Sequence, residues 1–116
     1  MFVIDNAQMR SFAEKAREDF VDRMLVYIRD HFPKKFNRFG ERAMRRHASK
    51  IMDEAKSYGF ETERQIVNFL DLGLLCGRFQ NEPWAAKSLN PDSGDPKRRI
   101  RRLRADAFRA TGRIRS

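Results

Sequence analysis

Apolar residues recur every three or four positions along most of the chain, a spacing that places them on one face of an α-helix. The first such stripe comprises Met9, Phe12, Ala13, Ala16, Phe20, Met24, Tyr27 and Ile28. Asp5 is suited to cap the start of this helix. Pro33 disfavours helical geometry in the residue before it, so we expect the helix to end near His31.

A second stripe predicts a helix that begins at about Asn37 or Gly40 and ends at Tyr58. Gly59 occupies the position where a glycine commonly ends a helix. Phe60 follows as the apolar residue that often packs back on such an end. This pattern indicates a sharp turn directly after the second helix.

A third helix is indicated by Thr62 and Gln65, which have the spacing of a capping box. The segment that follows, "IVNFLDLGLLC", is apolar nearly all round, and Gly77 can close it. A helix of that composition belongs in the interior, so we expect it to be the most buried element. Pro83 can then begin a short fourth helix, since proline favours the first helical position.

The last segment predicts a basic amphipathic helix over residues 96–111, capped by Asp95 and ended by Gly112. Its apolar stripe comprises Ile100, Leu103, Ala107, Ala110 and Ile114. Most of its arginines are expected on the opposite side. A disordered basic arm would not need this stripe, so the pattern favours a packed helix over a loose tail.

These elements predict an all-α fold, a compact bundle of four to five helices with a basic amphipathic helix at the C-terminus. A chain of 116 residues is long enough for one small core of this kind. We expect a helical bundle domain over residues 1–92. Residues 93–116 form a loop and the basic C-terminal helix, which packs on that domain or on a partner.

The net charge of +9 is concentrated in two zones. Residues 34–50 contain seven basic residues and one acidic residue, and residues 97–116 contain nine and one. The remaining segments, residues 1–33 and 51–96, are net acidic. Such concentrated positive charge indicates a negatively charged partner.

Catalytic and metal-binding motifs are missing from the sequence. The histidines, His31 and His47, do not belong to a metal-binding motif, and no phosphate-binding glycine loop is present. The single cysteine, Cys76, excludes a disulfide framework and lies in an apolar segment, where an inert thiol is expected. We therefore expect no enzymatic activity, cofactor or metal, and no run is long enough to span a membrane.

Arginine forms forked contacts with carboxylates and is enriched in protein interfaces. The lone tryptophan is an additional candidate anchor. The candidate partner-binding residues are Arg38, Arg42, Arg45, Arg46, Arg98, Arg99, Arg101, Arg102, Arg104 and Trp84. The function that this pattern favours is a protein–protein interaction module.

Nucleic-acid binding is the alternative from another class. Residues 51–70 resemble a helix-turn-helix superficially, through the spacing of Ala55 and Gly59. The helix that would read bases begins with Glu61 and Glu63, whose carboxylates repel phosphates. Phosphate affinity of the arginine-rich tail still fits the sequence. A membrane-surface helix is a third and weaker reading, because the apolar stripe is short and rich in alanine.

Two tracts resemble a group of small helical bacterial proteins encoded beside type VI secretion spike, PAAR or toxic-effector genes. These are "DRMLVYIRDHFP" and "AKSYGFETERQIVNFLDLGLLCGRFQNEPWAAKSL". The matching positions are Phe20, Arg23, Met24, Phe32, Pro33, Ala55, Tyr58, Gly59, Thr62, Phe69, Gly77, Phe79, Pro83, Trp84, Ala85 and Leu89. The resemblance covers about residues 10–90, and the tail after Asn90 is richer in arginine than in that group.

The resemblance implies an adaptor or chaperone-like accessory protein of the bacterial cytoplasm. Its acidic partner would be a secreted effector or a spike component. An immunity protein that neutralises a toxic effector is the alternative within the same class. The sequence does not separate these two roles.

Overall fold

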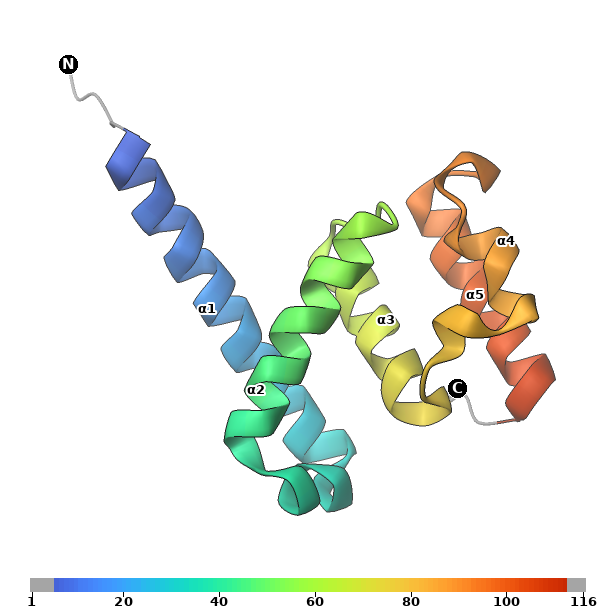
Figure 1. Cartoon of the computed structure of the whole chain (residues 1–116), viewed down its shortest axis with the longest axis horizontal. Helices are drawn as coiled ribbons and strands as arrows, with labels where there is room; N and C mark the ends of the chain where they lie inside the picture. Colours follow the sequence, from blue (N-terminus) through green and yellow to red (C-terminus); the bar gives the residue numbers. More distant parts are fainter. Residues whose placement is uncertain (1–5, 113–116) are drawn as a thin grey trace. The chain divides into compact units, whose positions relative to one another are not determined.

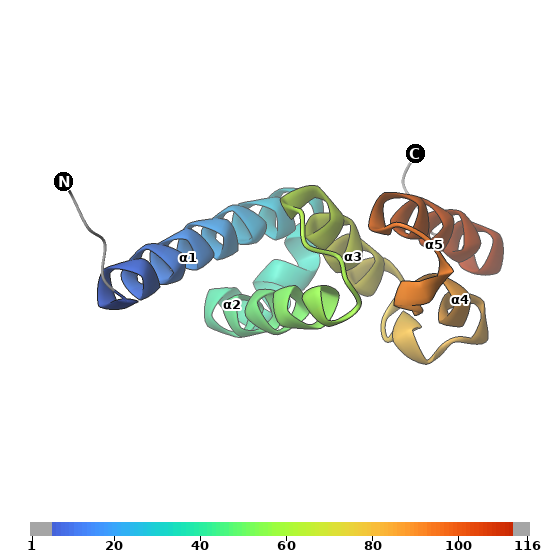
Figure 2. The same cartoon turned by 90° about the horizontal axis from the view of Figure 1, so that it is seen from above.

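The computed structural model describes the backbone of residues 6–112 and the side chains of residues 14–112. That part of the chain contains five α-helices and no strand, which confirms the expected all-α fold (Figure 1, Figure 2). The helices are α1 (Asn6–His31), α2 (Pro33–Ser57), α3 (Glu63–Cys76), α4 (Ala86–Leu89) and α5 (Pro96–Thr111). The short 3-10 turns are η1 (Phe79–Asn81), η2 (Pro83–Ala85) and η3 (Pro91–Ser93).

The chain divides into two compact units, residues 1–49 and residues 50–116, with the boundary inside α2. The sequence had favoured residues 1–92 and 93–116. In the structure α5 belongs to the second unit because it packs on α3, η2 and α4 (yellow to red in Figure 1). The basic C-terminal helix is therefore packed on its own domain.

Pro33 shapes the junction of α1 and α2. It ends α1 at His31, as predicted, and it is also the first residue of α2, so that Phe32 alone separates the two helices. Proline needs no N–H partner in the first helical turn, and its fixed φ suits that position. The expected start at Asn37 or Gly40 is therefore too late for α2 as a whole, although it coincides with the kink at Gly40, after which the second helical segment begins.

A kink at Gly40 interrupts α2. The backbone there has φ 84° and ψ 161°, a combination that side-chain-bearing residues rarely adopt. Residues 33–39 and 41–57 consequently form two helical segments that meet at the glycine. The apolar periodicity of the sequence predicted the second segment but not the first.

The apolar stripe of α1 is buried over its second half. Its buried residues are Phe20, Val21, Met24, Leu25 and Ile28. Ala16, which belongs to the predicted stripe, is exposed instead. The predicted cap at Asp5 and the side chains of residues 9–13 lie outside the described residues. In the first unit Arg17 Nη2 donates a hydrogen bond to the carbonyl oxygen of Ser49, at 3.3 Å.

The predicted glycine turn after α2 is confirmed. Gly59 has φ 88°, and its N–H donates to the carbonyl oxygen of Lys56 at 2.9 Å. The N–H of Phe60 donates to the carbonyl oxygen of Ala55 at 3.0 Å, and the Phe60 ring is fully buried. The turn thereby satisfies carbonyl groups at the end of the helix while it buries an aromatic ring.

The capping box of α3 is also confirmed. Gln65 N donates to Thr62 Oγ1 at 3.1 Å, and Thr62 N donates to Gln65 Oε1 at 3.4 Å. No residue from Gln65 to Cys76 is exposed, as expected for a helix that is apolar nearly all round. Gly77 ends this helix with φ 68°.

The predicted short helix at Pro83 begins as the 3-10 turn η2 and continues as α4. The last helix has the expected bounds. Asp95 accepts a hydrogen bond from Arg98 N at 2.9 Å, and Gly112 ends α5 in the left-handed region. This agreement reflects capping signals that act locally and need no tertiary contact.

Part of the predicted α5 stripe is buried. Ile100, Leu103 and Ala107 lie in the interior of the second unit. Ala110 is exposed, and Ile114 lies outside the described residues. The apolar face of α5 is therefore used for packing within the chain over its first three turns.

Candidate functional site

Two sets of arginines occupy α5. Arg99, Arg102 and Arg104 point back to the second unit, where each donates hydrogen bonds to other segments. Arg98 and Arg101 lie on the solvent side and are exposed. Residues 98–104 therefore contain both structural arginines and arginines that are accessible to a partner.

Arg99 is buried, with 1% of its surface exposed. Its Nε donates to the carbonyl oxygen of Ser88 at 2.9 Å, and its Nη2 donates to those of Leu89, at 3.2 Å, and Tyr58. Arg99 was a candidate partner-binding residue. The structure corrects this, because its guanidinium is enclosed by the chain itself.

The charge of Arg99 is balanced by helix ends rather than by a carboxylate. Tyr58 directly follows α2, and Ser88 with Leu89 ends α4, so these carbonyl groups carry the partial negative charge of helix C-termini. The guanidinium also lies over the Phe60 ring, 4.6 Å from its centroid. These contacts stabilise a buried cation in the described part of the chain.

Burial lowers the pKa of Arg99, and the nearby charge of Arg102 lowers this pKa further. An arginine nevertheless stays protonated at neutral pH. The residue is therefore a permanent cation that ties the end of α2 and the end of α4 to α5.

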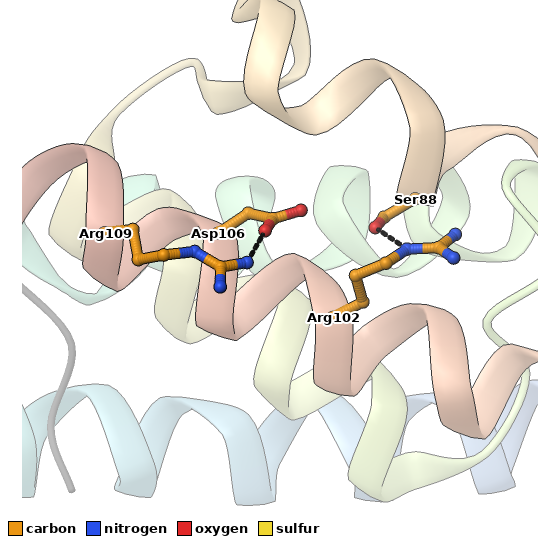
Figure 3. A network of polar contacts seen from close by, with 4 residues as sticks. All are labelled: Ser88, Arg102, Asp106 and Arg109. Atoms are coloured by element: carbon orange, nitrogen blue, oxygen red, sulfur yellow. Dashed lines mark hydrogen bonds and ion pairs between the residues drawn. The ribbon is translucent and has the colours of Figure 1, made fainter.

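Arg102 and Arg104 are half-buried and bonded within the same unit. Arg102 Nε donates to Ser88 Oγ at 2.8 Å, a contact visible in Figure 3, and its Nη2 donates to Ser93 Oγ at 2.7 Å. Arg104 donates to the side-chain oxygen of Asn68 on α3. Both side chains therefore help to hold α5 against the rest of the second unit. Fewer of their N–H groups remain for a partner.

The solvent side of α5 combines cations with an aromatic ring. Arg98 forms a long ion pair with Asp95, 3.7 Å between Nε and Oδ2, and 85% of its side chain is exposed. Lys97 and Arg101 are exposed and have no polar partner within the described residues. Phe108 is 55% exposed on the same helix.

Arg38, Arg42 and Arg46 are exposed on α2. Arg45 is exposed as well, but it pairs with Asp22 at 2.8 Å and with Glu41 at 3.7 Å. These partners neutralise much of the charge of Arg45. Its role is therefore explained by contacts inside the first unit.

Phe39 is 54% exposed on α2, and the guanidinium of Arg38 lies 5.4 Å from the centre of its ring. The first unit thus also presents cations beside an aromatic ring. Trp84 is half-buried and stacks on Phe79, with ring centroids 6.2 Å apart. Part of the indole is therefore packed against the core of the second unit.

Two grooves in the first unit, of about 380 and 310 Å³, share the Asp22–Arg45 ion pair as part of their walls. Their charged side chains are therefore partly paired with one another. No three His, Cys, Asp or Glu side chains are grouped to hold a metal ion in residues 14–112. None of the helices described for this chain is long and apolar enough to cross a membrane.

Comparison with known proteins gives no match to a family model, to a curated protein or to a solved structure. The resemblance to proteins encoded near type VI secretion genes therefore stays a prediction.

Three exposed residues next to the candidate arginines were not among the candidates: Phe39, Lys97 and Phe108. A signal for Phe108 was present, since it falls outside the apolar stripe of the last helix. The inward position of Arg99 also had a signal, because it lies four residues before the buried Leu103 and therefore on a nearby part of the helix surface.

Proposed function

We propose that this chain is a non-enzymatic interaction module, an adaptor or chaperone-like accessory protein that binds an acidic protein partner through exposed arginines. A secreted effector or spike component of a type VI secretion system, met in the bacterial cytoplasm, is the partner class that the sequence resemblance implies. An immunity protein against a toxic effector is the alternative.

The observation that carries this proposal is the set of exposed cations without a polar partner. Within the described residues Lys97 and Arg101 on α5 are such cations. Unpaired cations beside exposed aromatic rings have the composition of a protein interface. Carboxylates on a partner would pair with these groups.

The test is co-purification followed by quantitative binding. The tagged chain is expressed in a bacterium that carries type VI secretion genes, and captured proteins are identified and then purified. Direct binding is measured by calorimetry at several salt concentrations. We expect an acidic protein, with an affinity that falls moderately as salt rises because only part of the interface is ionic.

Nucleic acid is the competing outcome. Tight duplex binding that falls by several decades between low and moderate salt would indicate six or more phosphate contacts and would overturn the proposal. Co-expression with the captured protein separates the two roles in the preferred class. Loss of its toxicity indicates immunity, whereas unchanged toxicity with stable co-purification indicates an adaptor.

A further inference from the structure

The exposed face of α5 contains Lys97, Arg101, Ala105 and Phe108. With 3.6 residues per turn, Lys97, Arg101 and Phe108 point within about 40° of one another. The buried residues Leu103 and Ala107 point about 140° and about 100° away from the middle of this arc. We call it the outer face of α5.

The outer face has cations at one end and an aromatic ring at the other. Lys97 and Arg101 are one turn apart, and Phe108 lies about 10 Å further along the helix than Arg101, at a rise of 1.5 Å per residue. Asp95, which precedes the helix, contacts Arg98. Asp106 is the acid inside α5, and it points to a different side and pairs with Arg109 (Figure 3). No carboxylate within residues 97–111 therefore neutralises this face.

The position of the cations is unfavourable for an isolated helix. The first turn of α5 contains no acidic residue, and it contains Lys97, Arg98 and Arg99. Helix N-termini carry partial positive charge, so each exposed cation there destabilises the helix. Arg99 is explained by its buried hydrogen bonds and Arg98 is next to Asp95, but Lys97 has no such compensation. A local rule broken without an internal gain is typical of a binding surface.

We infer that the outer face of α5 is the surface that binds the partner, and that the partner presents an acidic peptide segment with an apolar side chain about 10 Å from its carboxylates. This inference rests on the proposed function. Charge complementarity selects carboxylates for Lys97 and Arg101, and the exposed ring of Phe108 selects an apolar contact. Evenly spaced phosphates of a duplex would match only the cationic end.

The chain supplies matched controls on α2. Arg42 and Arg46 are also exposed, also four residues apart on a helix, and also without a polar partner in the described part of the protein. Phe39 has nearly the same exposure as Phe108, 54% against 55%. The pairs K97E/R101E and R42E/R46E therefore change the net charge equally, and F108A and F39A remove similar apolar surface.

The probe is a synthetic helical peptide with four glutamates and a leucine two turns away, labelled for fluorescence anisotropy. A second peptide has serine in place of the leucine, and a single-stranded DNA and a duplex of 20 nucleotides serve as competing polyanions. The full chain is used throughout, and circular dichroism verifies its helix content. Glutamate at position 97, in the first turn of α5, favours the helix, and the circular dichroism spectrum checks that R101E keeps its helix content.

We expect K97E/R101E to weaken peptide binding at least tenfold and F108A to weaken it about tenfold, the loss expected of a residue that contributes substantially to an interface. The peptide with serine in place of leucine should bind F108A and the unmodified chain with similar affinity. R42E/R46E and F39A should stay within about twofold of the unmodified chain. Chemical shift changes in NMR spectra should map to residues 97–108.

Loss of peptide binding in R42E/R46E with binding retained in K97E/R101E would overturn the inference and leave the proposed function intact. The inference would also be overturned, with the proposed function intact, if the unmodified chain does not bind the peptide but captures an acidic protein through α2. Duplex DNA that competes at micromolar affinity for the same face, with no acidic protein captured, would overturn both.

Discussion

Replacement of Arg99 by methionine should strongly destabilise the second unit. Methionine keeps a similar chain length and removes every donor. The carbonyl groups of Tyr58, Ser88 and Leu89 then lose their hydrogen bonds to the guanidinium, and the stacking over Phe60 is lost. At about 1 kcal/mol for each hydrogen bond and about 1 kcal/mol for the cation–π contact, the loss is about 4 kcal/mol.

Relief of the desolvation of a buried charge opposes this loss and can offset part of it. We therefore expect R99M to lower the free energy of unfolding by about 2–4 kcal/mol. The assay is urea unfolding of the full chain followed by circular dichroism, together with amide hydrogen exchange of α5. Exchange is included because it reports the local stability of α5 in addition to that of the whole chain.

R101M is the matched control, since it is the same substitution two residues further along α5 at an exposed position. We expect it to change the stability by no more than about 0.5 kcal/mol. If R99M and R101M have the same free energy of unfolding, the reasoning is refuted, because the hydrogen bonds of Arg99 to the helix-end carbonyl groups then make no net contribution to stability.

Other substitutions test the turns and caps. G59A should destabilise the chain by about 1–2 kcal/mol in urea, because Gly59 has φ 88° and an added Cβ would lie 3.3 Å from Arg99 Nη1. G73A should instead stabilise α3 by about 0.5–1 kcal/mol, since Gly73 lies inside the helix with open space around it; a loss would contradict this. T62A should remove about 1 kcal/mol with the capping box, and an unchanged midpoint would argue against the cap. D22A should cost less than about 1 kcal/mol in thermal melts, because its ion pair with Arg45 is exposed.

The bounds of α3 and α5 could be predicted from the sequence because their end signals are local. Thr62 and Asp95 each bond a backbone N–H three residues away, and Gly77 and Gly112 supply the positive φ that ends a helix. None of these signals depends on what the helix packs against. The start of α2 was missed because Pro33 fits both a helix-stopping and a helix-starting role, and only the folded chain shows that it has both.

The division of arginines on α5 could be predicted only in part. The stripe of Ile100, Leu103 and Ala107 indicated which side is buried. The spacing from Leu103 placed Arg99 near that side, but it did not show that a guanidinium could be buried there, because the acceptors are carbonyl groups of Tyr58 and Ser88 that reach it only through the tertiary fold. A charged residue is normally expected outside, and a buried one needs partners that a helical wheel does not display.

The first turn of α5 therefore contains two cations with opposite energetic outcomes. Arg99 places a cation at the start of α5, where the helix dipole disfavours it, and gains hydrogen bonds to the ends of two other helices. Lys97 adds to that unfavourable charge and has no gain within the described chain. If binding supplies the missing gain, a carboxylate partner should stabilise α5, and its amide exchange should slow on addition of the acidic peptide. Such protection should be absent in K97E, whose first turn already contains an acid, and this comparison separates stabilisation by a partner from stabilisation by packing.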